Sequence, residues 1–372
     1  MKIKSVSVLA FARTLDGRAY NPVFRWRERR APLVVVETAA GARGIGEAWS
    51  RYTDIQSVFE ALAQVVAPAL SGRTIEHPRG AAAGLPIKPG ASTPWALSAA
   101  LSAVDIALWD AFGHECNQPV WQLLGGTSDR APVYASGGLY RDNYSTDDLA
   151  AEMAAYVAQG FNAVKMKVAG LPLEDDLQRA RAVRSAIGAD RVLWIDAVNQ
   201  LTAHSAPAWC ARFKELGATA IQAPLPFDDL AGMARLNRDA MPVIAAESEF
   251  RHEVFADLLE QRAVSHLQFC LPLCGGFSGA CALDDRAAAL GISTTPQCFS
   301  TSIAQAATLH FAAARRNVVS AEYHGYHDHL KALYRGTTGT VAAGYASAGC
   351  TPGLGVAIPG LGLQPDGSLV SA

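Results

Sequence analysis

From residue 131 to about residue 324, short apolar stretches alternate with Ala-rich helical stretches, and this repeat constrains the fold most strongly. The apolar stretches are six to eight residues long and contain many β-branched residues, which is typical of buried strands. Stretches such as 149–160 and 175–188 have the character of helices. The expected strands are residues 132–137, 161–168, 191–198, 218–225, 242–248, 266–271, 292–298 and 318–324.

Eight strand–helix units of this length predict a (β/α)8-type barrel. The alternative is a doubly wound open sheet, but that fold usually has fewer strands. No G-x-G-x-x-G follows the first strand, as a dinucleotide-binding version would require. The Gly-rich stretch 352–362 precedes no helix and is interpreted as a turn-rich tail.

The first 125 residues have a different pattern. Residues 2–12 and 32–39 favour a small antiparallel sheet, while 54–70 and 95–115 show helical periodicity. We therefore expect a separate α+β domain that ends near the paired glycines at 125–126.

Composition excludes several classes of protein. The 372 residues carry a formal net charge of −2 and contain no basic stripe for nucleic acid. The sequence contains no run of about 18 apolar residues, so it predicts no membrane span. The N-terminus is interpreted as a strand rather than a signal peptide. The seven cysteines form no C-x-x-C pair, which favours reduced thiols and a cytoplasmic protein.

Polar residues recur where the barrel strands are expected to end, and barrel active sites form at those ends. From Lys167 onward they follow one another every 23 to 29 residues, which predicts one ring at the barrel mouth. Lys165 precedes Lys167 by two residues, so both side chains should share a face of the strand. The ring consists of Lys165, Lys167, Asp196, Gln222, Glu247, Cys270, Gln297 and Glu322.

The ring has the chemistry of an acid–base site with a metal. Asp196, Gln222 and Glu247 offer oxygen ligands to a hard cation such as Mg²⁺. Repulsion between two buried ammonium groups should lower a lysine pKa and produce a general base. A bound metal would stabilise the enediolate formed when that base removes a proton α to a carboxylate. The structural alternatives are helix-capping carboxylates and an outward-facing lysine.

Several motifs resemble the mandelate racemase and muconate lactonizing branch of the enolase superfamily, across nearly the whole chain. The segment ALSAVDIALWDAFGHECNQPVWQLLGG (100–126) resembles the junction between capping domain and barrel. FNAVKMKV (161–168) resembles the K-x-K of the second strand. CGGFSGA (274–280), ATLHFAAA (307–314) and PGLGV (352–356) match in type and order.

The resemblance implies a modified (β/α)7β barrel under an N-terminal α+β capping domain. The expected domains are residues 1–127 for the capping domain, 128–345 for the barrel, and 346–372 for a tail packing back on the capping domain. Family habits also imply a homo-oligomer. Loops of the capping domain around 16–30 and 47–55 should close over the substrate, with possible contacts from Tyr20, Arg25, Trp26, Trp49 and Tyr52.

By the same resemblance, Lys167 would be the base, with Lys165 tuning it and touching the substrate carboxylate. Asp196 and Glu247 would be metal ligands, and Glu322 would contact substrate. The resemblance implies proton abstraction α to the carboxylate of a small molecule, usually with Mg²⁺.

Several positions depart from the family pattern. Gln222 replaces the second ligand carboxylate. Cys270 and Gln297 replace the Asp and His that form the opposite acid–base pair in racemases. Val198 replaces an expected asparagine, but Asn199 follows it directly as a possible substrate contact. Glu249, two residues after Glu247, could restore the missing negative charge.

These departures favour a one-base reaction, namely dehydration of a hydroxy or sugar acid, because Gln297 cannot accept a proton. An epimerase, racemase or cycloisomerase that uses Cys270 as second acid–base group is one alternative. A non-catalytic carboxylate-binding relative is another.

Overall fold

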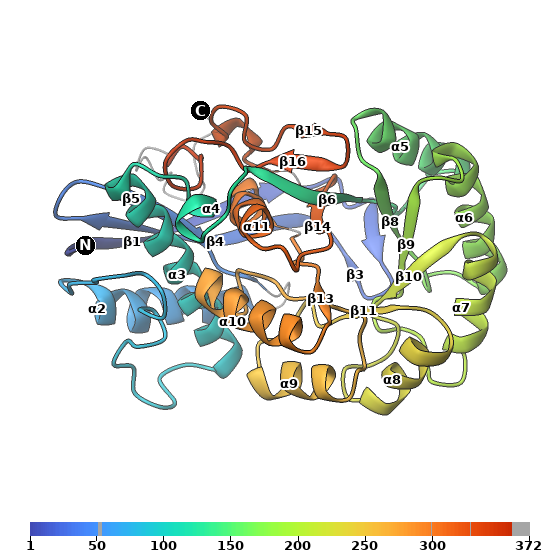
Figure 1. The fold of residues 1–372 in the computed structure, drawn as a ribbon, viewed down its shortest axis with the longest axis horizontal. Coiled ribbons are helices and arrows are strands. Elements are labelled where there is room, and N and C mark those ends of the chain that lie inside the picture. Colours follow the sequence, from blue (N-terminus) through green and yellow to red (C-terminus); the bar gives the residue numbers. More distant parts are fainter. Residues whose placement is uncertain (51–53, 299, 328, 359–372) are drawn as a thin grey trace.

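The computed structural model describes residues 1–50, 54–298, 300–327 and 329–358, and within them two parts lie side by side (Figure 1). The N-terminal part is a three-stranded antiparallel sheet with helices, and the larger part is a barrel. The expected fold, an α+β capping domain with a modified (β/α)7β barrel, is confirmed.

The capping sheet has the order β1-β4-β5. Its strands β1 and β4 pair in antiparallel register from Ile3 opposite Thr38 to Thr14 opposite Glu28. A short second sheet, β3-β2-β7, joins the capping domain to the segment after the first barrel strand. The strands are β1 (Ile3–Thr14), β2 (Ala19–Asn21), β3 (Phe24–Arg25), β4 (Glu28–Thr38), β5 (Arg43–Glu47) and β7 (Tyr140–Arg141).

The longest helix, α3 (Pro94–Cys116), packs against β4 and β5 and also against α10 of the barrel. Its backbone approaches β5 so closely that a Cβ on Gly46 would lie 1.9 Å from the Ala103 carbonyl oxygen. By length and hydropathy α3 could cross a membrane, but 78% of that window is buried inside the protein. Its apolar composition therefore reflects a core helix. Further helical segments of this part are α1 (Ile55–Glu60), the π-helical segment η1 (Ala61–Val66), α2 (Ala67–Leu70) and α4 (Val120–Leu123).

All eight expected barrel strands are present among the described residues, and they pair in parallel in chain order. The barrel closes where β14 pairs with β6, from Ala321 opposite Val133 to His324 opposite Ser136, and where Thr294 bridges to Val318. The barrel strands are β6 (Arg130–Ser136), β8 (Ala163–Lys167), β9 (Val192–Asp196), β10 (Ala218–Gln222), β11 (Val243–Ala245), β12 (His266–Leu267), β13 (Ser293–Thr294) and β14 (Ala321–His324).

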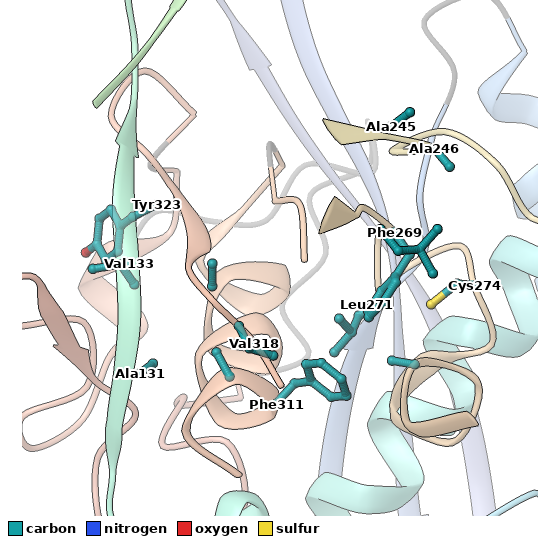
Figure 2. Close-up of a cluster of buried hydrophobic side chains, with 14 of the residues drawn as sticks. Ala131, Val133, Ala245, Ala246, Phe269, Leu271, Cys274, Phe311, Val318 and Tyr323 are labelled. Carbon is teal, nitrogen blue, oxygen red and sulfur yellow. The ribbon is translucent and has the colours of Figure 1, made fainter. Parts of the chain in front are cut away.

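Helices follow the barrel strands and run around the outside of the barrel (Figure 1). The core between strands and helices is continuous. Figure 2 shows part of it, where Phe269 and Phe311 meet edge to face with ring centroids 5.6 Å apart. The helices are α5 (Thr146–Ala158), α6 (Leu173–Ile187), α7 (Ala206–Glu215), α8 (Leu230–Asp239), α9 (His252–Glu260), α10 (Gly276–Ala289) and α11 (Ser302–Ala314).

After β14 the chain forms a 3₁₀ turn, η2 (Lys331–Leu333), and a hairpin of β15 (Val341–Ala342) and β16 (Tyr345–Ser347) that extends β6. It then returns to the capping domain, where the Asp110 carboxylate of α3 accepts the Leu354 N–H at 2.7 Å. The exact domain boundaries and the homo-oligomer stay predictions.

Candidate active site

A cavity of about 350 Å³ lies at the carboxyl ends of the barrel strands, under the capping domain. Its walls include five of the barrel residues that the sequence predicted for the site. These are Lys167, Asn199, Glu247, Gln297 and Glu322. Trp49 of the capping domain also lines it, as predicted.

Backbone register explains why the polar residues converge. Lys167 pairs with Asp196 across β8 and β9, and Asp196 pairs with Gln222 across β9 and β10. Their side chains therefore lie at one height, as the spacing predicted. Glu247 lies two residues beyond the end of β11 and reaches Gln222 from a loop.

The chain turns sharply after several of these strands. Ala169, Val198, Asn199, Ala223 and Ala246 follow β8 to β11 and have positive φ angles. A left-handed backbone costs about 1–2 kcal/mol for a residue with a Cβ, and for a β-branched residue such as Val198 it is rare. Backbone strain thus gathers at the barrel mouth, a pattern typical of functional sites.

The two lysines and two carboxylates form one buried ionic network. The Lys165 ammonium donates to Glu322 at 2.7 Å and lies 3.0 Å from Asp196. The Lys167 ammonium donates to the same oxygen of Asp196. Lys165 is 1% exposed and lies beneath the cavity, whereas Lys167 lines it. The lysine doublet faces inward, as predicted, but of the two only Lys167 is among the cavity-lining residues.

The lowered pKa expected for a lysine of this doublet is not found at Lys165. Burial does act to lower the pKa of Lys165, but attraction to Glu322 and Asp196 outweighs it and raises that pKa well above its usual value. Conversely, burial acts to raise the pKa of Asp196, and the two ammonium groups bring it below its usual value. Asp196 between the two lysines and Glu322 beside Lys165 outweigh the repulsion that the sequence alone suggested.

Gln222 lies between the Asp196 and Glu247 positions. Its amide N–H donates to Glu247 at 2.6 Å, and its amide oxygen is buried with no partner among the described residues. Burial and the neighbouring Asp196 raise the pKa of Glu247 to about 7. Two carboxylates and an unpartnered amide oxygen fit a hard divalent cation, which would offset the repulsion between the carboxylates.

Glu249 does not supply the missing charge. Its oxygens accept hydrogen bonds from the backbone N–H groups of Phe250 and Arg251 and from the Arg251 guanidinium. In the part of the chain that the structure describes, no three His, Cys, Asp or Glu side chains converge as metal ligands. A cation between Asp196 and Glu247 would therefore take its third protein oxygen from Gln222.

The opposite side of the mouth carries no charged group from the predicted ring. Cys270 bridges to Gln297 through the backbone, but its side chain belongs to the apolar core shared with the capping domain. Burial raises the pKa of the Cys270 thiol well above its usual value. Cys270 is not among the cavity-lining residues, so the expectation that it acts as a second acid–base group is not supported. Gln297 lines the cavity with its amide oxygen unpartnered among the described residues.

Two predicted contacts of the capping domain lie elsewhere. Tyr20 stacks on Tyr140 with centroids 5.5 Å apart, and Arg25 forms an ion pair with Asp142 at 2.5 Å. Both residues hold the small β3-β2-β7 sheet together and are absent from the lining of this cavity. Trp26 and Trp49 do line it. Tyr52 lies outside the described residues.

Sequence reasoning missed two histidines of the cavity wall, His324 and His327. His324 follows Glu322 by two residues on β14, so the two-residue period of a strand places both on one face. That spacing was a usable signal, because the same argument had been applied to Lys165 and Lys167.

Family models match most of the chain. Residues 24–125 match the N-terminal domain of mandelate racemase and muconate lactonizing enzyme, and residues 148–361 match the enolase C-terminal domain-like family. A mandelate racemase/muconate lactonizing enzyme-like protein from Rubrobacter xylanophilus has a solved structure with a TM-score of 0.86. It is 27% identical, and the match covers 96% of this chain and 97% of that one.

Curated relatives have different reactions. Arabinonate dehydratase of Saccharolobus solfataricus is 31% identical over 217 residues, which is 58% of this chain and 58% of that enzyme. N-succinyl-L-Arg/Lys racemase of Bacillus cereus is 27% identical over 334 residues, or 87% of this chain and 88% of that enzyme. The chain therefore matches less than two thirds of the first relative, and the two names differ in reaction type.

Proposed function

Because this chain belongs to the mandelate racemase and muconate lactonizing branch of the enolase superfamily, we propose that it is a lyase acting on a small carboxylate. In the proposed reaction Lys167 removes the proton α to the substrate carboxylate, and a β-hydroxyl group then leaves. The substrate class is a hydroxy or sugar acid.

The observation that carries this proposal is the asymmetry of the two lysines. Lys167 lines the cavity, while Lys165 is buried and held between Glu322 and Asp196. Lys165 thus remains a fixed positive charge beside the base. Lys167, in contrast, lies at the cavity surface, where its amine can reach the α-carbon of a bound substrate.

The proposed chemistry uses one proton carrier. Neutral Lys167 takes the α-proton, and the electron pair of the C–H bond passes into the carboxylate to give an enediolate. That pair then forms a carbon–carbon double bond as the C–O bond to the β-hydroxyl breaks, and the enol product tautomerises to the 2-keto acid. The resulting ammonium returns the proton to the departing oxygen, so water leaves and Lys167 is neutral again. Neither Gln297 nor the protonated, buried Cys270 offers a second proton carrier.

Asp196, Gln222 and Glu247 would hold Mg²⁺. A cation held there would supply positive charge that favours removal of the α-proton. Gln222 lowers the ligand charge relative to the family pattern, which predicts weaker metal binding than three carboxylates would give.

A deuterium-exchange assay tests the function. The protein is incubated in D₂O with MgCl₂ and a panel of aldonates, beginning with arabinonate, and α-deuteration and keto-acid formation are followed by NMR. We expect exchange and a 2-keto-3-deoxy acid with the parent protein. Both should disappear in Lys167→Ala and persist in Lys88→Ala, an exposed-lysine control.

Other outcomes identify the alternatives. Exchange with stereochemical inversion and no loss of water would favour an epimerase or racemase. Binding of carboxylates without exchange of any α-proton would overturn catalysis in favour of a binding-only relative.

A further inference from the structure

His324 ends the last barrel strand and faces the same cavity as Lys167. It is 5% exposed and lies two residues beyond Glu322, which holds Lys165. Its backbone N–H donates to the Gln305 amide oxygen at 3.2 Å, and the Gln305 N–H donates to the Glu322 carbonyl at 2.9 Å. The end of β14 is therefore fixed in position by α11.

The local backbone fixes the tautomer of the His324 ring. Its Nδ1 accepts hydrogen bonds from the backbone N–H groups of Tyr326 at 3.2 Å and His327 at 3.3 Å. A ring nitrogen that accepts hydrogen bonds carries no proton, so the proton of the neutral ring resides on Nε2. His324 therefore presents an N–H donor at Nε2.

The surroundings keep this ring neutral. Burial lowers the pKa of His324 well below its usual value, and Lys165, Lys167, Arg29 and His329 lower it further. The ring of His327 packs beside it with centroids 4.5 Å apart, and burial also lowers the pKa of His327 well below its usual value. His324 can thus donate a hydrogen bond, but it carries no positive charge with which to attract an anion.

Within the described part of the chain, Nε2 of His324 has no hydrogen-bond partner. This donor opens onto the cavity, where an oxygen of a ligand or of water can accept from it. The fixed ring therefore marks a place for an acceptor atom.

The rest of the lining indicates which acceptor. Among the described lining residues, Lys167 is the sole lysine or arginine, while Glu247 and Glu322 are acidic. A second anionic group on the substrate would be repelled by these two carboxylates. The described lining offers no further lysine or arginine to pair with it. Amides from Asn21, Asn199 and Gln200 line the wall as well, so the environment suits uncharged oxygens.

We propose that His324 is a specificity-determining residue whose Nε2–H donates to a hydroxyl oxygen of the substrate beyond the α-carbon. The substrate class is then a polyhydroxylated monocarboxylate, such as an aldonate, in preference to a dicarboxylate or a simple 2-hydroxy acid. This inference rests on the proposed function for the position of the carboxylate, but its test uses binding alone.

Two substitutions separate the role of the His324 Nε2–H as a donor to substrate from the role of Nδ1 as the acceptor for the Tyr326 and His327 N–H groups. His324→Asn keeps an acceptor oxygen near the Nδ1 position for Tyr326 and His327 but removes the Nε2–H. His324→Gln places an amide N–H near the Nε2 position but loses the acceptor for the turn. His204→Asn, at an exposed histidine, is the matched control.

Dissociation constants are measured by calorimetry with MgCl₂ in the Lys167→Ala background, where no turnover interferes. The probes are arabinonate and 2-hydroxypentanoate, followed by gluconate and 2-hydroxyhexanoate. Each pair shares a chain length and differs in its distal hydroxyls. We expect the Lys167→Ala protein to favour the aldonate. His324→Asn should weaken aldonate binding about tenfold and leave the simple acid unchanged, because a single neutral hydrogen bond is lost.

His324→Gln should retain most of the preference while lowering the Tm, since the turn loses its acceptor. Equal weakening of both probes by His324→Asn, or a fall in Tm without a change in preference, would indicate a structural role and overturn the proposal. Absence of any preference for the aldonates before substitution overturns it as well. Because Lys167→Ala removes catalysis, failure of the dehydration chemistry leaves this readout intact.

Discussion

The two sides of the barrel mouth are equally buried but chemically opposite. The lysine side, made of Lys165, Lys167, Asp196 and Glu322, is an interlocked set of charges. The opposite side, made of Cys270 and Gln297, has no charge from these residues. A buried charge is tolerated where a partner compensates it, so the lysine side depends on every member. The neutral side can vary without such a penalty, but neither Cys270 nor Gln297 offers a ready acceptor for the α-proton. The difference favours chemistry from one face of the substrate.

The largest expected effect lies at Lys167. Lys167→Ala should reduce the rate of α-proton exchange about 10²- to 10⁴-fold, because a positioned general base contributes this much. Steady-state assays with the best aldonate of the panel measure it, with Lys88→Ala as control. A loss below about tenfold would remove Lys167 from the role of base and break the contrast between the two sides.

Lys165 should matter most for stability. Lys165→Met removes the partner of Glu322 and one of the two partners of Asp196, and breaking a buried pair costs about 3–5 kcal/mol. Urea unfolding measures this free energy. The double variant Lys165→Met/Glu322→Gln should recover part of the loss, because no unpaired carboxylate remains at position 322. Equal stability of Lys165→Met and the parent protein would show that the network is not a stabilising unit.

A substitution at Gln222 tests the proposed metal site. Gln222→Glu adds a carboxylate beside Glu247 and Asp196, so it should lower the Tm without metal and tighten Mg²⁺ binding by about tenfold, because affinity follows ligand charge. Calorimetric titration with MgCl₂ measures the affinity. Bound Mg²⁺ should raise the Tm of the variant, and removal of the metal with EDTA should reverse that rise. An unchanged Mg²⁺ affinity would place the metal away from Gln222.

The smallest effect is expected at Cys270. Cys270→Ala should change the exchange rate less than about twofold, because the thiol is buried in the core and outside the lining. It should cost about 1 kcal/mol of stability through lost packing. Thermal unfolding and the exchange assay measure the two effects. A tenfold loss of rate at unchanged stability would return the thiol to the chemistry and sharpen the case for an epimerase.

The barrel was predictable because its signals are local. Each strand is a short apolar run, and parallel strands buried on both faces need such runs. The regular spacing of Lys167, Asp196 and Gln222 also predicted their common height, which the strand register confirms. The short strand β5 and the β3-β2-β7 sheet were not predicted, because their pairing depends on partners far away in the chain.

Side-chain environment was less predictable than position. The expectation of a lowered lysine pKa counted the neighbouring lysine but not the carboxylates of β9 and β14 that approach Lys165. Tyr20 and Arg25 lie in a loop region of the expected kind, yet their partners Tyr140 and Asp142 turn them away from the cavity. Contacts of this kind depend on how distant segments meet.

The sequence by itself determined the order of strands and helices and the residue types at the barrel mouth, because periodicity and composition are properties of the chain. The tertiary structure decided which of those groups face one another. It placed Asp196 between the two lysines and Glu322 beside Lys165, packed Cys270 into the core, and set the His324 ring in one tautomer. Proton affinity and hydrogen-bond direction depend on distances of a few ångströms between segments remote in sequence, and folding alone fixes those distances.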